Sequence, residues 1–181
     1  MKPALLLAAA LLAACADVKG PPVASGKKTM ADSADQVLFG QRMVITDRGL
    51  NRAEILSDTA YFFDENTRTE MRIVNGVFFD AEGKKDAVMT SRTGLFNQRL
   101  NSLEARGDVV ITGIDGRVLE TPYVRYDQRM GIISSDTTFT FTNRADGKVI
   151  HGIGFTTDPD LNNLNVHKLI SGKAGAVEVP K

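Results

Sequence analysis

The chain has 181 residues, of which 43% are hydrophobic, and its 22 lysines and arginines balance its 22 aspartates and glutamates. Zero net charge argues against nucleic acid as a partner, because proteins that bind it usually carry a strong basic excess. The part from residue 34 to residue 172 is the size of one domain with an adequate core.

Residues 1–14 have the layout of a secretory signal peptide, with one lysine followed by an apolar stretch too short to span a bilayer. Small residues precede Cys15, which is the only cysteine of the chain. This arrangement resembles a bacterial lipobox, a signal in which the cysteine is lipid-modified and becomes the new N-terminus. We therefore expect Cys15 to be a lipid anchor. The alternative is an uncleaved leader that serves as a short membrane anchor, with Cys15 inert.

Residues 15–33 contain glycine, two prolines, lysine and serine, and have little to bury. They predict a flexible linker behind the lipidated cysteine. Two or three acyl chains on Cys15 would hold the domain durably on a membrane, whereas a single chain binds reversibly. An aspartate directly after the cysteine favours inner-membrane retention in enteric bacteria, and here Asp17 comes one position later. The inner membrane is favoured, and the outer membrane stays open.

The first half of the domain predicts short strands, because apolar and polar residues alternate between turn residues. Residues 36–44 are a candidate first strand, and residues 50–63 form a more regular one. The alternation resumes at Met71 and Ile73, and Asn75-Gly76 predicts a break before the next strand at 77–79. Residues 87–93 predict a further strand.

The stretch 103–155 is a ladder of hairpins, with turns predicted at Gly107-Asp108, Asp115-Gly116, 127–131 and 143–147. No window has a convincing apolar stripe at helical spacing. Turns recur about every 14 to 18 residues, which indicates an approximate repeat of two short strands. Residues 164–170 predict a final strand, and residues 173–181 a disordered tail.

The sequence carries no constellation for catalysis, and the phosphate-loop, nucleophile-elbow and zinc-protease motifs are missing. His151 and His167 are the only histidines, and they are interpreted as ordinary residues of a sheet face. Asp158, Asp160 and Asn162 match the start of a calcium loop, but the required later glycine and glutamate are missing. We therefore predict no enzyme activity, no cofactor and no metal. An enzyme acting on envelope glycan or lipid is the least favoured function.

An ordered set of segments resembles the LptC family of lipopolysaccharide-export proteins, which is related to LptA and OstA-like domains. The segments are 56–61, 104–111, 115–121, 124–127, 133–136, 150–155 and 169–172. Known members keep an N-terminal membrane helix where this chain has a lipobox.

The resemblance implies an all-β, twisted and open β-jellyroll, an antiparallel hairpin ladder with exposed edge strands at both ends. It implies a non-catalytic, periplasmic bridge component that accepts lipopolysaccharide acyl chains in an apolar groove. Its partners would be the subunits of an inner-membrane ABC exporter and a periplasmic bridge protein of the LptA type, bound by edge-strand pairing. Unpaired edge N–H and C=O groups do recruit further strands.

Alternate residues of each predicted strand are expected to face the interior. The predicted lipid-binding groove consists of Tyr61, Phe63, Met71, Ile73, Val77, Phe79, Leu103, Val109, Ile111, Leu119, Val124, Tyr126, Phe139, Phe141, Ile153 and Phe155. The predicted partner edge strand presents Leu164, Val166, Lys168 and Ile170. The alternative is a membrane-tethered scaffold lipoprotein that pairs through its edges and has a filled core.

Overall fold

The computed structural model describes residues 29–173, and within this range the chain forms nine strands and no helix. The signal peptide, Cys15, linker residues 16–28 and the tail beyond Lys173 lie outside the described residues. The strands are β1 (Gln36–Asp47), β2 (Leu50–Phe63), β3 (Arg68–Phe79), β4 (Lys85–Asn97), β5 (Ser102–Gly113), β6 (Arg117–Asp127), β7 (Ile132–Asn143), β8 (Lys148–Thr157) and β9 (Asn165–Lys173).

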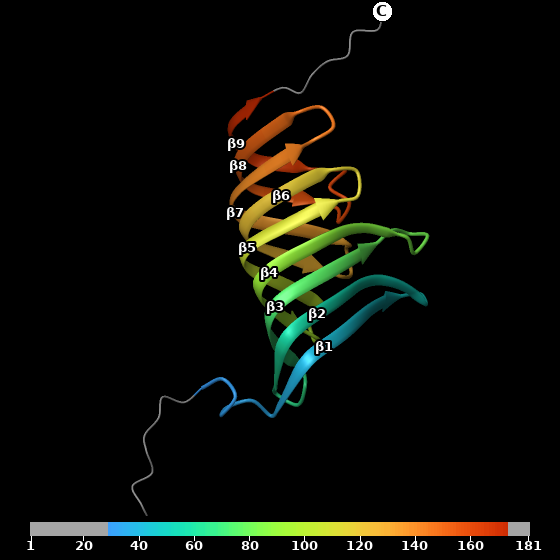
Figure 1. Cartoon of the computed structure of the whole chain (residues 1–181), viewed down its shortest axis with the longest axis vertical. Helices are drawn as coiled ribbons and strands as arrows, with labels where there is room; N and C mark the ends of the chain where they lie inside the picture. The colour runs from blue at the N-terminus through green and yellow to red at the C-terminus, as the bar shows by residue number, and fades with distance from the viewer. Residues whose placement is uncertain (1–28, 174–181) are drawn as a thin grey trace, which may run out of the picture.

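The strands of residues 29–173 make one antiparallel sheet in which each strand pairs with its neighbours in the sequence. β1 and β9 are therefore the two edges, and they lie at opposite ends of the long axis (Figure 1). The prediction of an open, all-β hairpin ladder is confirmed. The break predicted at Asn75-Gly76 is wrong, because β3 continues through it and Gly76 pairs with Ile55 and Met89. Gly76 is buried there in close contact with both side chains.

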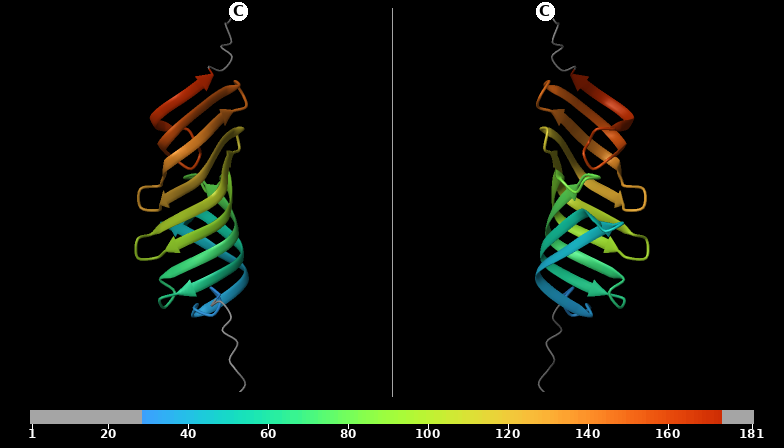
Figure 2. Two further views of the ribbon diagram at one scale, coloured as in Figure 1. Left: turned by 90° about the vertical axis from the view of Figure 1, so that its left-hand side faces the viewer. Right: turned by 90° about the vertical axis from the view of Figure 1, so that its right-hand side faces the viewer.

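Each long strand bends near its middle, so the sheet folds over and its two halves face each other (Figures 1 and 2). We call this line of bends the corner. At the corner the alternation of buried residues is interrupted. In β3 the buried residues Met71 and Val74 are three positions apart, and in β6 Thr121 and Val124 are as well. The face that points inward therefore changes phase within one strand.

Unusual backbone conformations mark the corner. The turn predicted at Gly107-Asp108 is wrong, because β5 continues through these two residues. They have φ values of 77° and 47°, and the pairing of β5 with both neighbours shifts register beside them. A glycine with positive φ next to a register shift is typical of a β-bulge, which sharpens the bend and twist of a strand. Ile73 also has a positive φ of 50°, although a β-branched side chain disfavours that region.

The two halves of the folded sheet enclose one continuous apolar core that extends from Ile45 in β1 to Leu161 beyond β8. Buried hydroxyl groups lie just before the corner, as Ser57, Ser91, Thr121 and Ser135 show. Thr121 donates a hydrogen bond to the carbonyl oxygen of Thr138 at 2.9 Å, which ties β6 to β7 where the ladder is interrupted. The core thus keeps its polar groups paired at the bend.

Candidate functional site

The interior of the folded sheet contains most of the residues predicted to line a groove. All those in this group are less than a tenth exposed and belong to the core cluster: Met71, Leu103, Val109, Ile111, Leu119, Val124, Tyr126, Phe139, Phe141 and Phe155. They come from both halves of the sheet, so the fold brings together the predicted residues of 103–155 other than Ile153. Whether they bind lipid stays a prediction.

The remaining predicted groove residues do not belong to the core. Ile73 is 62% exposed, and Tyr61, Val77, Phe79 and Ile153 are half-buried and outside the core cluster. The expected inward positions of these five residues are wrong. The cause is the corner, because a phase change within the strand turns the expected residue outward.

Phe63 is also outside the core cluster, although it is buried. The Arg68 guanidinium lies over its ring, 4.1 Å from the centroid. A cation over an aromatic face is stabilising where the pair is partly shielded from water. Phe63 thus packs under a charged group at the β2–β3 hairpin and does not line the interior.

Sequence reasoning missed several residues that take the inward positions. Val74 and Phe78 replace the expected residues of β3, and Ile133 in β7 is fully buried. The signal that could have found them is a phase change at the corner, which only Gly107-Asp108 marks clearly in the sequence. Leu161 is 1% exposed although it lies in a predicted loop, where it is the single apolar residue of 156–163.

Aromatic contacts fill the middle of the interior. The rings of Phe78 and Tyr126 meet edge to face with centroids 5.5 Å apart, and those of Phe139 and Phe155 do so at 5.0 Å. A Cβ on Gly152 would lie 2.6 Å from the Phe139 ring, so this ring packs directly on the β8 backbone. Burial raises the pKa of the Tyr126 hydroxyl above its ordinary value, against the opposing effect of the Arg52 charge.

A groove of about 380 Å³ opens from the core near the β9 end. Its apolar walls are Phe141, Ile150, Leu161 and Leu164, and Asp115, Arg117, Asp146 and Lys148 are among the residues of its rim. Arg117 pairs with Asp115 in the β5–β6 turn. The hydrogen bond from Arg117, which outweighs the effect of burial, lowers the pKa of the Asp115 carboxyl.

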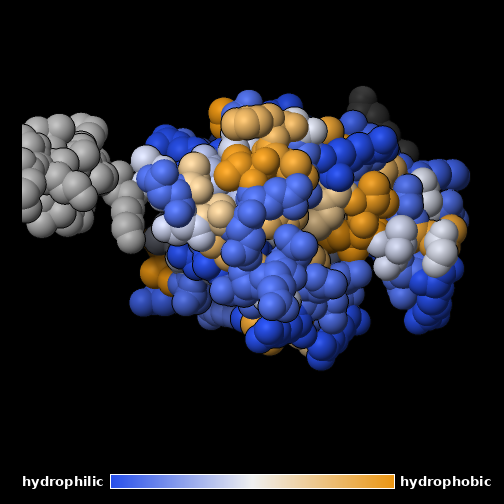
Figure 3. Space-filling model, turned by 90° about the horizontal axis from the view of Figure 1, so that it is seen from below, coloured by the Kyte–Doolittle hydropathy of each residue, from blue (hydrophilic) through white to orange (hydrophobic). Residues whose placement is uncertain are grey.

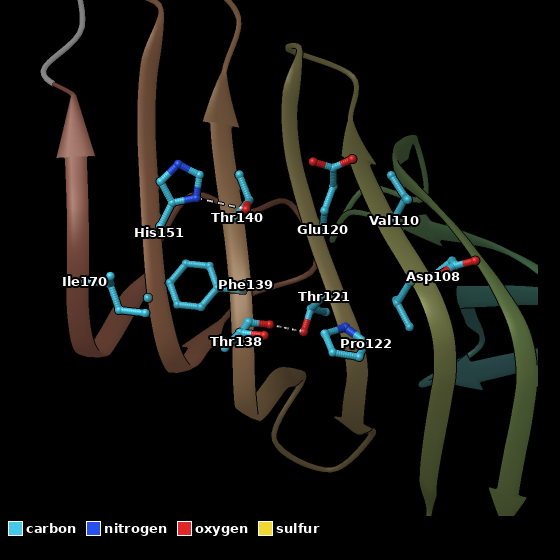
Figure 4. Close-up of a pocket in the computed structure, with 12 residues that line it drawn as sticks. Asp108, Val110, Glu120, Thr121, Pro122, Thr138, Phe139, Thr140, His151 and Ile170 are labelled. Carbon is cyan, nitrogen blue, oxygen red and sulfur yellow. Dashed lines mark hydrogen bonds between the residues drawn. The ribbon is translucent and has the colours of Figure 1, made fainter.

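A second groove of about 620 Å³ runs over strands β5 to β9 and is lined by both polar and apolar residues, among them the predicted groove residues Val109 and Phe139 (Figure 4). Glu120, Thr140 and His151 lie in one cross-strand row there, and the Thr140 hydroxyl is 3.0 Å from His151 Nδ1. His167 lies beside Gly154, and His151 pairs with Ser171, so the two histidines do not pair with each other.

The two edge strands differ in how much apolar surface they expose. Near β1, the exposed apolar residues are Leu38, Phe39, Val44, Leu50 and Leu56, and Phe39 is 80% exposed. The view from the β1 end shows apolar surface gathered on one side of this face (Figure 3). On β9, Leu169 and Ile170 are 62% and 58% exposed.

The predicted partner strand at the β9 edge is only partly one-sided. Leu164 and Val166 pack against the core, whereas Lys168 and Ile170 are exposed. The register of β9 on β8 shifts between His151 and Gly152, beside Ile170, whereas Val166 and Lys168 keep one register with β8. The role of the four residues in partner binding stays a prediction.

Among residues 29–173, no group of three or more histidine, cysteine, aspartate or glutamate side chains could hold a metal ion. Asp158 and Asp160 instead accept hydrogen bonds from the backbone of Asn162, at 2.8 and 3.0 Å. The same range contains no helix long and apolar enough to cross a bilayer.

Comparisons with known proteins give one family. The family model described as "Lipopolysaccharide-assembly, LptC-related" matches residues 4–173. Among solved structures, the chain is similar to LptH from Pseudomonas aeruginosa, described as the LptA homologous periplasmic component of the conserved lipopolysaccharide transport device. That likeness has 12% identity and a TM-score of 0.49, and covers 71% of this chain and 89% of that chain. No curated protein matches the chain.

Proposed function

Because the chain belongs to the lipopolysaccharide-assembly, LptC-related family, we propose that it is a non-catalytic bridge component of lipopolysaccharide transport. Acyl chains of lipopolysaccharide enter between the two halves of the folded sheet, and the protein passes them between envelope transport proteins. The observation that carries the proposal is one apolar interior running between two unpaired edge strands. Burial of acyl surface would drive capture, at about 25 cal/mol per Å² of apolar area.

The partners in this proposal bind at the two edges. A strand at the edge of a sheet has a row of unpaired N–H and C=O groups, which recruit a strand of another chain. We place the inner-membrane ABC exporter subunits at β1, where Phe39 and its neighbours expose apolar surface, and an LptA-type bridge protein at β9. The exporter would supply the energy for directional movement.

The proposed location is the periplasm, with acylated Cys15 holding the domain on the periplasmic face of the inner membrane. Residues 16–33 would act as the linker between the lipid and the sheet. This proposed location is supported by the amino-acid sequence that precedes the domain. The first residue that the structure describes is Thr29.

One observation favours a second candidate, a tethered scaffold lipoprotein with a filled core. The aromatic contacts between Phe78 and Tyr126, and between Phe139 and Phe155, occupy the middle of the interior. In this candidate the edges still pair with other chains, but no lipid passes between the two halves of the sheet.

Photo-crosslinking separates the two candidates. A benzophenone amino acid replaces Phe139, which is 4% exposed in the interior, or the adjacent Thr138, which is exposed. The purified protein is irradiated with lipopolysaccharide. The bridge function requires more adducts at position 139 than at position 138. Equal adducts at the two positions would rule it out and leave the scaffold.

A further inference from the structure

The connection between β8 and β9 differs from the other turns that follow even-numbered strands. Residues 158–164, which we call the strap, cross the folded sheet and reach the side on which the β5–β6 and β7–β8 turns lie (Figure 1). A Cβ on Gly113 would lie 3.6 Å from the carbonyl oxygen of Asp160. Strap residues and the β5–β6 and β7–β8 turns also line one groove together. The strap therefore closes the interior near β9.

The strap inserts one apolar side chain into the core. Leu161 is 1% exposed and has a positive φ of 61°, a backbone region that leucine rarely adopts. It lies in the core cluster and shares a groove with Phe141, Ile150 and Leu164. A strained backbone conformation persists only where the surrounding contacts stabilise it. The burial of the Leu161 side chain is therefore a specific feature of the strap.

The strap is organised by its own polar groups. Asp158 Oδ1 accepts hydrogen bonds from the backbone N–H groups of Asn162 and Asn163, at 2.8 and 3.2 Å. The Leu161 N–H donates to the Asp158 carbonyl oxygen at 3.1 Å. Within residues 29–173, every hydrogen bond found for strap residues joins them to one another or to Thr157.

Apolar contacts hold the strap to the sheet, since Leu161 belongs to the core cluster and Leu164 packs against it. The Asp158 charge does not add to that attachment at β4: burial and the charges of Asp80, Asp115 and Asp158 raise the pKa of the Asp86 carboxyl, and Arg117 opposes them. Because the hydrogen bonds of the strap are internal, it can leave as a unit.

We infer that the strap is a displaceable plug, and that Leu161 occupies a binding position for an acyl chain. When the strap leaves, the chain of an amphiphilic lipid binds against Phe141 and Ile150, which belong to β7 and β8. This inference rests on the proposed function, and it adds the place near β9 where the lipid waits before transfer. The occupant is an acyl chain because the position belongs to the apolar core and is filled by a leucine, although the rim of the groove is polar.

The test places a benzophenone amino acid at Phe141, a groove-lining residue of similar shape, in the full chain. Adducts with lipopolysaccharide are compared between this protein and the same protein carrying Asp158→Ala or Leu161→Ala. Asp158→Ala removes the hydrogen bonds that shape the strap and keeps Leu161, so it serves also if Leu161→Ala fails to fold. The matched control is Asp127→Ala, which removes a similar pair of hydrogen bonds to Arg129 and Met130 from the β6–β7 turn.

We expect Asp158→Ala to raise the adducts at position 141 several-fold, and Asp127→Ala to leave them unchanged. Leu161→Ala, if folded, should raise them as well. Unchanged adducts at position 141 in Asp158→Ala, together with strong adducts at position 139, would overturn the plug and leave the bridge function standing. A failure of lipid to react at both positions would overturn both. An equal rise in the Asp127→Ala control would also overturn the plug, because general loosening would then explain the effect.

Discussion

The rings of Phe78 in β3 and Tyr126 in β6 meet edge to face, at an interplanar angle of 70°, although β4 and β5 separate their strands in the sheet. The contact exists because the sheet folds at the corner and brings the two halves face to face. It therefore reports on closure of the interior more directly than any contact between paired strands.

Replacing Phe78 with alanine should destabilise the protein by about 3–5 kcal/mol, as truncation of a buried aromatic side chain leaves a cavity. A double-mutant cycle with Tyr126→Ala should give a coupling of about 0.5–1.5 kcal/mol, the usual range for an aromatic pair. Urea unfolding of the two single variants and the double variant measures both values. Strictly additive effects would show that the rings do not pack together in solution.

Replacing Gly152 with alanine should destabilise the sheet, because the new Cβ would lie 2.6 Å from the Phe139 ring and 2.9 Å from the Lys168 carbonyl oxygen. The expected loss is about 1–3 kcal/mol, as for other overpacked sites. Thermal unfolding compares it with Gly172→Ala, where the nearest atom is 3.5 Å away. Equal melting temperatures for the two variants would contradict the close packing of Phe139 on β8.

Replacing Asp86 with asparagine should stabilise the protein at pH 7. Burial and the charges of Asp80, Asp115 and Asp158 raise the pKa of Asp86, and Arg117 opposes them. A carboxyl with a raised pKa contributes stability that is full below its ordinary pKa and is lost as the pH rises through the raised value. The variant removes that loss.

The gain from Asp86→Asn should be roughly 0.2–1 kcal/mol at neutral pH, because the half-buried group still touches water, which screens its interactions. It should shrink as the pH falls below the ordinary pKa of an aspartate. Urea unfolding at pH 7 and at about pH 3.5 measures the difference. The exposed Asp136, changed to asparagine, is the control. A gain that is the same at both pH values would contradict the electrostatic explanation.

A positive charge at the β9 edge should weaken the binding of an LptA-type bridge protein. Leu169→Lys replaces a side chain that is 62% exposed on the edge strand, and a lysine there disfavours strand pairing. Ile73→Lys is a matched control, since Ile73 is equally exposed but lies in the interior strand β3. Binding to the purified bridge protein is measured by pull-down. Deletion of residues 164–172 should abolish binding, and binding that survives the deletion would refute a β9 interface.

Replacing Cys15 with alanine should release the protein from the membrane, because the proposed acyl chains would have no attachment site. Fractionation of cells and metabolic labelling with a fatty-acid analogue measure the outcome. Ser33→Ala, a small change at the end of the linker, is the control. Membrane attachment and labelling that persist in Cys15→Ala would instead favour an uncleaved leader.

The sequence was sufficient for the order of the strands. Alternating residues between turn residues predict hairpins, and hairpins in series can only give an antiparallel ladder with its first and last strands at the edges. The predicted turns at Asp115-Gly116, 127–131 and 143–147 coincide with the connections between the observed strands, whereas those at Asn75-Gly76 and Gly107-Asp108 lie inside β3 and β5. These features are local, so a single sequence carries them.

The alternation of apolar and polar residues predicts the inward face of a strand on one side of the corner only. Val109 and Ile111 are buried as expected, but Val77 and Phe79 give way to Val74, Gly76 and Phe78. The change happens at the corner, where the strand must bend so that the two halves can pack. Ile73 takes a positive φ there, and nothing in its residue type signals it.

The sequence by itself determined an antiparallel ladder with an apolar face and two free edges, because short-range alternation and turn chemistry encode both. The tertiary structure alone decided where the ladder bends and which residues meet across the interior. It also decided that the side chain of Leu161, a loop residue, packs in the core. The physical reason is that contacts such as Phe78 with Tyr126 form only when the sheet folds onto itself. No pattern within one strand records that event.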